Sequence, residues 1–281
     1  MKQRVVFAGI QTGPALGSPE KELRRALSLI DRAFEEDPSI DLIALPEGFL
    51  FYPTFRTRDQ IRELPEGLLK NFSERAGKYH AYLVTGSIIY RDAAGRRRNT
   101  SFVFDREGQL IAEYDKIHLF DVLDQAGLKK ESLLVDRGQE LTVFDADFGR
   151  VALAICYDIR FPEMIRRLAL AGAEYLVVPA AFYAPRDDQW RLLLRAAALQ
   201  NGLYVMGVNQ IGPGAAGSAL CGASLIAGPQ GELLAEAPAW KEPGEGDLSR
   251  VIRAELDPSE PSSVREALGL IHNRVPGIDT L

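Results

Sequence analysis

The sequence predicts an α/β fold with mixed β-sheets, and two observations lead to this prediction. Strand-length runs that are almost wholly apolar, such as residues 5–10 and 42–45, alternate with segments of helical periodicity. That alternation is typical of sheets covered by helices. Other strand-like segments flank short polar turns, as around residues 105–108, and such hairpins place antiparallel strands in the sheets. A simple Rossmann fold, whose sheet is mostly parallel, is therefore not expected.

The N-terminal half is expected to contain strand–helix units followed by a hairpin. Residues 5–10 form a buried strand, and Ser18 and Pro19 then supply an N-cap and a proline at the first helical position. Residues 42–45 form the next strand, which ends at Pro46. The remaining elements are a helix at 68–79, one strand at 81–89, and a hairpin of strands 100–104 and 110–114.

The C-terminal half continues the same alternation. Two fragments recur weakly in it: residues 41–49 resemble 174–182, and residues 11–14 resemble 210–213. Pseudo-symmetric halves explain these repeats, and so does chance similarity between buried strands. No linker divides the chain, which favours a single domain. The expected elements are a hairpin of strands 141–144 and 151–155, a helix at 162–171, a strand at 175–178, a helix at 188–200, a strand at 203–208, a hairpin turning at 228–231 and a strand at 251–256.

Composition and charge narrow the classes of partner. The chain has 281 residues, and its 33 basic and 39 acidic side chains give a formal net charge of −6. This mild acidity argues against a nucleic-acid groove or an anionic membrane surface. Two cysteines are too few for a disulfide framework, and no apolar run is long enough for a signal peptide or a membrane span. We therefore expect a cytoplasmic protein with no nucleic-acid partner and no membrane partner.

Three residues at the ends of predicted strands are candidates for chemistry. Cys156 follows the apolar strand 151–155 and precedes a predicted helix, at a turn where main-chain N–H groups converge. Glu47 directly follows Pro46, and Lys116 lies at the end of the second hairpin strand. Each has an ordinary interpretation as well: a buried structural thiol, a surface carboxylate at a sheet edge, and a solvated ammonium.

Together the three side chains supply what amide hydrolysis needs. A thiol is mostly protonated at about pH 7, so a nucleophilic cysteine needs a base, and a desolvated carboxylate can serve. Attack on an amide carbon then forms an oxyanion, which a fixed ammonium stabilises. Two other sites are conceivable. His118 could be the base for Cys156, and His118, Asp121 and Asp124 have the spacing of metal ligands, although a solvated loop explains these acids equally well.

Three segments carry a family resemblance: Leu45-Pro-Glu-Gly-Phe49, Tyr114-Asp-Lys-Ile-His-Leu-Phe120 and Ile155-Cys-Tyr-Asp-Ile-Arg-Phe-Pro-Glu163. In order and spacing they resemble the signature segments of the nitrilase (carbon–nitrogen hydrolase) superfamily, and most closely the branch with ω-amidases and deaminated-glutathione amidases. The resemblance implies a four-layer α-β-β-α sandwich with two mixed sheets. It also implies a single carbon–nitrogen hydrolase domain over residues 1–258 and a C-terminal tail over 259–281 that packs on a partner subunit.

The same resemblance implies a role for each matching residue. Cys156 is the nucleophile, Glu47 the general base and acid, and Lys116 the cation that stabilises the oxyanion. Glu131 falls where relatives have a second glutamate that helps hold the lysine and the substrate, and the N–H of Tyr157 completes the oxyanion hole. No cofactor and no metal is expected. Family members typically assemble through dimers, so we expect a homodimer or a higher homo-oligomer.

Substrate-binding candidates follow the nucleophile. Arg160 lies four residues after Cys156, where some carbamoyl-amino-acid hydrolases of the superfamily have an arginine that binds the substrate carboxylate. The resemblance therefore implies the same role for Arg160, and the alternative is an ion pair with Glu163 or Asp158. Two aromatic residues complete the candidate set: Phe182 and Tyr183.

The resulting interpretation is an amidase. It hydrolyses a small linear amide that also bears a carboxylate, giving an acid and ammonia through a cysteine thioester. Hydrolysis of N-carbamoyl amino acids is the alternative, nitrile hydrolysis is less favoured, and a catalytically silent binding protein of the same fold is a further alternative. Gln189 stands where relatives in this branch often have histidine, so the resemblance alone does not identify the substrate.

Overall fold

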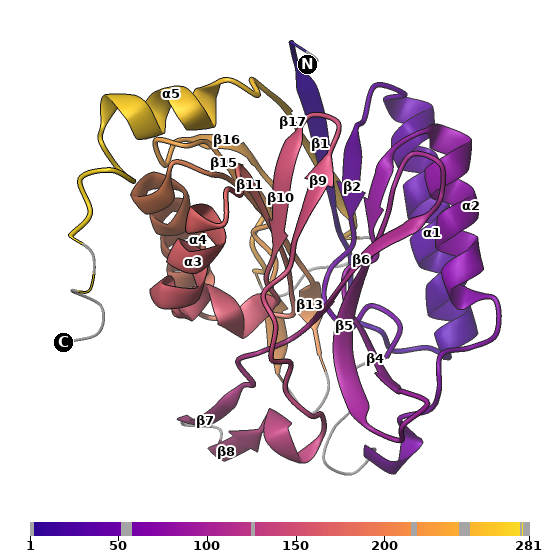
Figure 1. Ribbon diagram of the computed structural model, residues 1–281. Coiled ribbons are helices and arrows are strands. Elements are labelled where there is room, and N and C mark those ends of the chain that lie inside the picture. The colour runs from indigo at the N-terminus through magenta and orange to yellow at the C-terminus, as the bar shows by residue number, and fades with distance from the viewer. Residues whose placement is uncertain are drawn as a thin grey trace.

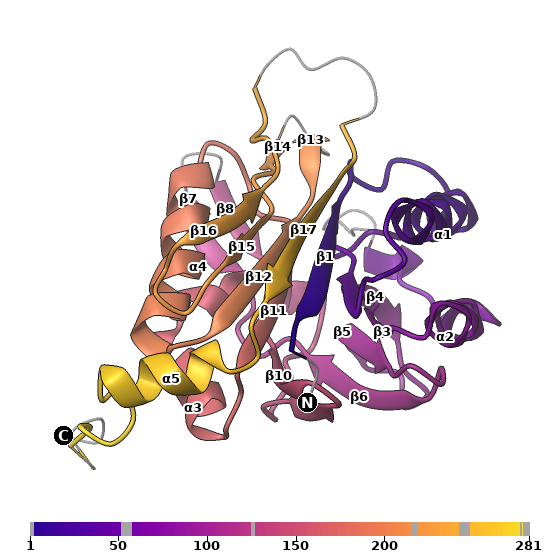
Figure 2. The same cartoon turned by 90° about the horizontal axis from the view of Figure 1, so that it is seen from above.

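Two β-sheets pack face to face between two layers of helices (Figure 1). Helices α1 (Pro19–Glu36) and α2 (Leu68–Tyr79) cover the outer face of one sheet, and α3 (Pro162–Leu170) and α4 (Asp187–Asn201) cover the outer face of the other (Figure 1 and Figure 2). The expected four-layer α-β-β-α sandwich is therefore confirmed. The computed structural model describes residues 3–51, 58–124, 127–214, 218–241, 248–275 and 277.

The first sheet has seven strands of mixed direction. They are β1 (Val5–Gln11), β2 (Leu42–Ala44), β3 (Tyr82–Val84), β4 (Ile88–Arg91), β5 (Arg97–Phe104), β6 (Leu110–Asp115) and β17 (Arg250–Leu256). Their order is β17-β1-β2-β3-β5-β4, with β6 paired to β5. The pairs β1–β2 and β2–β3 are parallel, whereas β17 and β5 run antiparallel to their neighbours β1 and β3.

The second sheet has six strands and is mixed as well. They are β9 (Val143–Ala146), β10 (Gly149–Leu153), β11 (Tyr175–Ala180), β12 (Tyr204–Asn209), β15 (Leu225–Ala227) and β16 (Leu233–Glu236). Their order is β16-β15-β12-β11-β10-β9. The pairs β10–β11 and β11–β12 are parallel, and the predicted hairpins β9–β10 and β15–β16 flank this parallel centre.

The β1 strand explains why the central strands are almost wholly apolar. Phe7 belongs to the core between the two sheets, whereas its neighbour Ala8 belongs to the core under α1 and α2. Because both faces of the sheet are buried, the polar–apolar alternation of a half-exposed strand is missing. Helix α1 begins where predicted, since Ser18 Oγ accepts a hydrogen bond from the Lys21 N–H at 3.4 Å.

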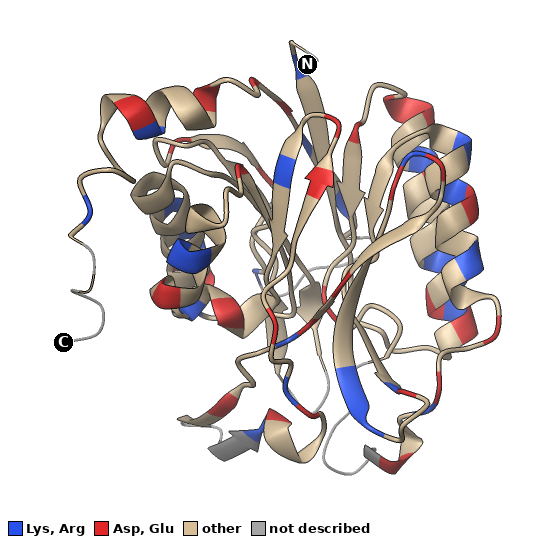
Figure 3. Ribbon diagram, in the orientation of Figure 1, with Lys and Arg blue, Asp and Glu red and all other residues tan. Residues whose placement is uncertain are grey.

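The outer helices carry charges of both signs. On α1 and α2 the acidic and basic residues are interspersed along the ribbon rather than segregated (Figure 3). Lys70 Nζ lies 3.8 Å from Oε1 of Glu74, which is one turn further along α2. In the part of the chain that the structure describes, no helix is both long and apolar enough to cross a membrane.

The two weakly repeated fragments lie side by side. Thr12, just after β1, forms a parallel bridge with Gln210, just after β12, and the Ile211 N–H donates to the Thr12 carbonyl oxygen at 3.0 Å. The bridge therefore joins the C-terminal end of β1 in the first sheet to the C-terminal end of β12 in the second. The fragments 11–14 and 210–213 are thus neighbours in space as well as similar in sequence.

The single strand predicted over residues 81–89 is wrong, because the chain forms two strands there, β3 and β4. Gly86 separates them with a φ of +74°, a conformation that favours glycine. A β-carbon at Gly86 would lie 2.1 Å from the carbonyl oxygen of Pro46, so only glycine fits against this segment. The close approach lets Ser87 form a parallel bridge with Glu47, which fixes the backbone of that glutamate.

Several short elements have no counterpart in the predicted set. Helix α5 (Glu260–Ala267) lies where the tail over 259–281 is expected, and Arg265 donates from it to the carbonyl oxygens of Asn201 and Ala173. This helix therefore packs on its own chain, and packing of the tail on a partner stays a prediction; residues 276 and 278–281 lie outside the described residues. The other short elements are β7 (Asp121–Asp124), β8 (Gly127–Lys130), β13 (Ile211–Pro213), β14 (Ala219–Cys221), η1 (Arg58–Gln60), η2 (Glu131–Leu133) and η3 (Cys156–Arg160).

Candidate active site

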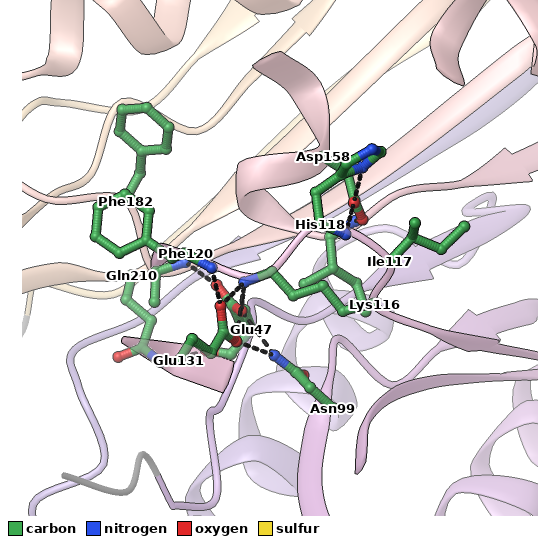
Figure 4. A network of polar contacts seen from close by, with 12 residues as sticks. Glu47, Asn99, Lys116, Ile117, His118, Phe120, Glu131, Asp158, Phe182 and Gln210 are labelled. Carbon is green, nitrogen blue, oxygen red and sulfur yellow. Dashed lines mark hydrogen bonds and ion pairs between the residues drawn. The ribbon is translucent and has the colours of Figure 1, made fainter. Parts of the chain in front are cut away.

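Three of the predicted site residues form one buried charge cluster (Figure 4). Glu47 follows β2, Lys116 follows β6, and Glu131 begins η2. The Lys116 ammonium lies 2.9 Å from Glu47 Oε1 and 2.9 Å from Glu131 Oε2. Their side chains are 0–7% exposed, so water screens these charges little.

The lysine is held as an ammonium by its two neighbours. Burial acts to lower the pKa of Lys116, but the carboxylates of Glu131 and Glu47 raise it well above its usual value. The backbone of the lysine is fixed as well. Its N–H donates to the Asn99 carbonyl oxygen at 2.9 Å, and its carbonyl oxygen accepts from the Gly138 N–H at 2.8 Å.

The Glu47 carboxylate accepts hydrogen bonds at both oxygens. Oε1 accepts from Lys116 and from the side-chain amide of Asn99, each at 2.9 Å. Oε2 accepts from the backbone N–H of Ala181 at 3.0 Å. The backbone carbonyl of Glu47 accepts from the Gln210 side chain, which reaches over from the second sheet. This carboxylate is therefore fixed by groups from both sheets.

The second glutamate is fixed in a similar way. Glu131 Oε1 accepts from Lys116 at 3.1 Å and from Asn99 at 3.3 Å, and Oε2 accepts from the Phe120 N–H at 2.7 Å. Burial raises the pKa of Glu131, Lys116 opposes this shift, and the nearby Glu47 carboxylate adds to it.

Cys156 lies at the first position of η3, in the turn that follows β10. Its φ is +50°, in the left-handed region that residues other than glycine seldom adopt. Burial raises the pKa of the thiol well above its usual value, and the negative charge of the Glu47 carboxylate adds to this effect, whereas Lys116 opposes it. Cysteine, lysine and glutamate are thus brought together, with the sulfur in its neutral thiol form.

One buried carboxylate ties the lysine segment to the cysteine turn. Asp158 Oδ2 accepts from the Tyr114 hydroxyl at 2.7 Å and from the Ile155 N–H at 2.9 Å. Its Oδ1 accepts from the His118 N–H at 2.9 Å and lies 2.8 Å from the His118 ring nitrogen Nδ1. Tyr114 and His118 flank Lys116 in the sequence, so Asp158 holds both sides of the lysine against the turn that carries the cysteine.

These contacts bear on the two other conceivable sites. The His118 ring contacts Asp158 and stacks on Phe161 at 3.7 Å between ring centres, partners other than Cys156. Asp121 Oδ1 accepts from the Ser132 N–H, and the side chain of Asp124 lies outside the described residues. Within the described part of the chain, no group of three or more His, Cys, Asp or Glu side chains is arranged to hold a metal ion.

A small pocket opens onto the cysteine and the lysine. All the substrate-binding candidates line it, and so does Tyr157, the residue after the cysteine. Burial and the nearby Cys156 and Glu47 raise the pKa of Tyr183 to about 12, so this wall of the pocket presents a neutral hydroxyl. The lining residues are Lys116, Phe120, Cys156, Tyr157, Arg160, Ala181, Phe182, Tyr183 and Arg186.

Arg160 lines the pocket, and Gln189 and Phe182 contact its guanidinium group. Its Nη2 donates to Gln189 Oε1 at 2.8 Å, and its guanidinium lies 5.2 Å from the centre of the Phe182 ring. The alternative of an ion pair with Glu163 or Asp158 is wrong, since neither carboxylate is within ion-pair distance. Among the described residues, no acidic side chain pairs with Arg160, and burial lowers the pKa of its guanidinium.

Some residues of the site have no sequence motif that predicts them. Asn99 contacts both glutamates, Ala181 donates its backbone N–H, Gln210 holds the Glu47 backbone, and Arg186 lines the pocket. Asn99 belongs to a run of five polar residues, 97–101, at the start of β5, and the sequence alone does not distinguish it from its neighbours.

Comparisons with known proteins agree with the fold and the motifs. The chain matches the carbon–nitrogen hydrolase family model over residues 7–266. The omega-amidase NIT3 of Saccharomyces cerevisiae is 34% identical over 284 residues, which cover 98% of this chain and 94% of the relative. The 2-oxoglutaramate amidase of Bacillus subtilis is 32% identical over 260 residues, which cover 92% of this chain and 93% of the relative. The crystal structure of Saccharomyces cerevisiae Nit3, a member of branch 10 of the nitrilase superfamily, superimposes with a TM-score of 0.84 and 30% identity over 98% of this chain and 97% of that one.

The fold and the family match define the class: the chain belongs to the carbon–nitrogen hydrolase family. It is an enzyme that hydrolyses carbon–nitrogen bonds other than peptide bonds. Within the nitrilase superfamily it lies in the branch of the omega-amidases and the deaminated glutathione amidases. The expected family, fold and enzyme class are confirmed, and the roles of the individual site residues stay predictions.

Proposed function

We propose that this enzyme hydrolyses a short linear amide bearing a carboxylate at its far end, releasing a dicarboxylic acid and ammonia. The observation that carries the proposal is the buried cluster of Glu47, Lys116 and Cys156, whose lysine and cysteine line the same pocket as Arg160. Two relatives at 34% and 32% identity are named omega-amidase and 2-oxoglutaramate amidase, and their names describe the same type of substrate.

The first half of the reaction forms a thioester. Glu47 takes the proton of the Cys156 thiol as the sulfur attacks the amide carbon, so the raised pKa of the thiol is overcome at the moment of attack. The negative charge that develops on the substrate oxygen is stabilised by the Lys116 ammonium and the Tyr157 N–H. The carbon–nitrogen bond then breaks, and Glu47 returns its proton to the leaving ammonia.

The second half regenerates the enzyme. Glu47 takes a proton from a water molecule as that water attacks the thioester carbon. The carbon–sulfur bond breaks, the sulfur recovers a proton from Glu47, and the acid product leaves. Glu131 keeps Lys116 charged and in place through both halves, because it accepts hydrogen bonds from the ammonium at 3.1 and 2.9 Å.

We propose that Arg160 selects the substrate. Arg160 has a planar guanidinium suited to a carboxylate, and Gln189 and Phe182 hold it at the pocket wall. Phe182 and Tyr183 pack along the uncharged chain of the substrate between its two ends. A short dicarboxylic acid monoamide fits this order of groups: amide at the cysteine, apolar chain, carboxylate at the arginine.

The test is ammonia release from matched amides. We expect turnover of a short dicarboxylic acid monoamide, and a lower kcat/KM for its analogue with a methyl group in place of the carboxylate. Arg160→Gln should raise KM for the charged amide by about 10–100-fold, the effect of losing a charge-assisted contact, and should leave the uncharged analogue nearly unchanged. Equal losses on both amides would show that Arg160 does not bind a substrate carboxylate.

We also propose a homodimer or a higher homo-oligomer in the cytoplasm. Leu192 and Leu199, one heptad apart on the outer face of α4, are 69% and 48% exposed, and exposed apolar side chains in a row are typical of an interface. Both cysteines are free thiols, which fits a reducing compartment. Light scattering on the purified protein tests the oligomer, and Leu192→Glu should shift it toward monomer.

A further inference from the structure

The buried cluster has more negative than positive charge. Glu47 and Glu131 are both within hydrogen-bond distance of the single Lys116 ammonium, and the pKa of the Cys156 thiol is raised, so the sulfur is neutral. Two carboxylates facing one ammonium favour uptake of a proton by one carboxylate. If Glu47 took that proton, it could not act as a base.

Asn99 points its side-chain amide at both glutamates (Figure 4). Its amide nitrogen is 2.9 Å from Glu47 Oε1 and 3.3 Å from Glu131 Oε1, so it bridges the same two oxygen atoms that Lys116 bridges. Asn99 comes from β5 and is 1% exposed. It therefore acts as a second donor to the pair, and it carries no charge of its own.

The orientation of this amide supports the same role. The Asn99 carbonyl oxygen is buried and has no hydrogen-bond partner among the described residues. The opposite orientation would point that oxygen at two carboxylates, which repel it, so the NH₂ group must face them. The side chain therefore directs its donor to the glutamates.

We propose that Asn99 is a positioning residue that keeps Glu47 in its proton-accepting carboxylate form and in a fixed orientation. The inference rests on the proposed role of Glu47 as general base. Asn99 and Lys116 hold Oε1 while the Ala181 N–H holds Oε2, so the carboxylate cannot rotate away from the thiol. A hydrogen bond to the charged form of an acid favours that form.

The other charged and titratable groups around Glu47 come from different elements. None of them replaces the donor that Asn99 supplies, since Lys116 is already shared and the rest are acids or more distant cations. His118 contacts Asp158 instead. The groups facing Glu47 are Lys116 after β6, Glu131 in η2, Cys156 in η3 and Tyr183 after β11, and Arg160 acts on the sulfur from the pocket wall.

The decisive experiment compares pH profiles. Asn99→Leu keeps the size of the side chain and removes the donor. A hydrogen bond to a charged group changes the pKa of that group by about one to two units. The acid limb of the profile of kcat/KM against pH should therefore move to a higher pH by that amount. Activity should then recover toward the wild-type value above the new limb. An acid limb that stays in place, with activity lowered equally at every pH, would overturn the proposal.

The matched control is a second buried asparagine. Asn201 is 2% exposed, and its amide donates to the Ala197 carbonyl within α4, away from the glutamates. Asn201→Leu should leave the acid limb where the wild type has it. If Asn99→Leu fails to fold, as judged by thermal unfolding, Asn99→Ser retains a hydroxyl donor and should give a smaller shift in the same direction; no shift in a folded Asn99→Ser would overturn the proposal.

A second readout needs no substrate. The rate at which iodoacetamide alkylates Cys156, followed by peptide mass spectrometry as a function of pH, reports the base directly. The acid limb of this rate should shift in Asn99→Leu as it does for turnover, and an unshifted limb counts against Asn99. If the wild-type enzyme releases ammonia from none of the amides, the proposed function fails, whereas the alkylation profile still decides the role of Asn99.

Discussion

Cys156 and Cys221 are both buried free thiols, yet only one has the surroundings of a nucleophile. Burial raises the pKa of both, and that of Cys221 reaches about 12. Cys221 lies in β14, where its sulfur is 3.1 Å from the amide nitrogen of Asn209. Cys156 instead lies in a tight turn beside Glu47 and Lys116 and lines the pocket.

The difference shows that burial alone does not activate a thiol. Desolvation makes both sulfurs poorer thiolates, so low pKa is not the source of reactivity at Cys156. The carboxylate that adds to the raised pKa of Cys156 is also the group that can remove its proton. A base and a cation within reach, rather than an acidic thiol, distinguish the candidate nucleophile from the structural cysteine.

The largest effect is expected from removal of the nucleophile. Cys156→Ala should lower amide turnover by at least about 10⁴-fold, since loss of a nucleophile disables the whole catalytic unit. Cys221→Ala should change turnover by less than about threefold, because it truncates a small side chain away from the pocket. Steady-state ammonia release measures both, with circular dichroism as the fold control. Comparable losses in the two variants would remove the distinction between the cysteines.

The next largest effect is expected from removal of the base, which lies beside Cys156 and not beside Cys221. Glu47→Gln keeps the shape of the side chain and should lower turnover by about 10²–10⁴-fold, the usual range for a general base. The same variant should slow alkylation of Cys156 and leave Cys221 unaffected. Single-turnover kinetics and peptide mass spectrometry provide the two measurements. Full activity in a folded Glu47→Gln protein would exclude Glu47 as the base.

Removal of the cation should have a somewhat smaller effect on rate. Lys116→Met deletes the charge that stabilises the oxyanion and should lower turnover by about 10²–10³-fold. Because it also leaves two buried carboxylates without their partner, unfolding in denaturant should show a loss of about 3–5 kcal/mol. Combined with Glu47→Gln, the loss in turnover should be much smaller than the product of the single losses, because the groups act as a unit. A strictly multiplicative double variant would argue for independent roles.

The smallest effect is a difference in labelling of the unmodified enzyme. Iodoacetamide should alkylate Cys156 before Cys221, because Cys156 lines the pocket and has Glu47 as a base. Labelling of both should accelerate as the pH rises, since the pKa of each thiol lies above its usual value and more thiolate forms at higher pH. Fast labelling of Cys221 with Cys156 untouched would reverse the assignment.

Much of the fold could be predicted because its signals are local. Ser18 caps α1 as its sequence indicates, and α2 spans the predicted residues 68–79. The break between β3 and β4 could not be predicted, because its cause is the contact of Gly86 with Pro46, which lies 40 positions earlier in the chain. Local apolar content continues through that break, so the pattern alone indicates one strand.

The residues of the candidate site likewise fall into those that a local motif predicts and those that depend on long-range contacts. Glu47, Lys116 and Cys156 lie in recognisable motifs at strand ends, and the fold brings them together. Asn99 and Ala181 contact Glu47 from 52 and 134 positions away, and the contribution of Ala181 is a backbone N–H that any residue would supply. No pattern in the sequence marks such a contact, because it depends on how the two sheets are packed.

The positive φ of Cys156 sets activity against stability at a single position. A residue other than glycine in this conformation costs about 1–2 kcal/mol, and the surrounding structure must supply it. Selection for folding alone would favour glycine or asparagine here, as at other left-handed turns. Variants isolated only for heat resistance should therefore tend to lose the cysteine, and a screen for sturdier forms of this enzyme needs an activity step to retain it.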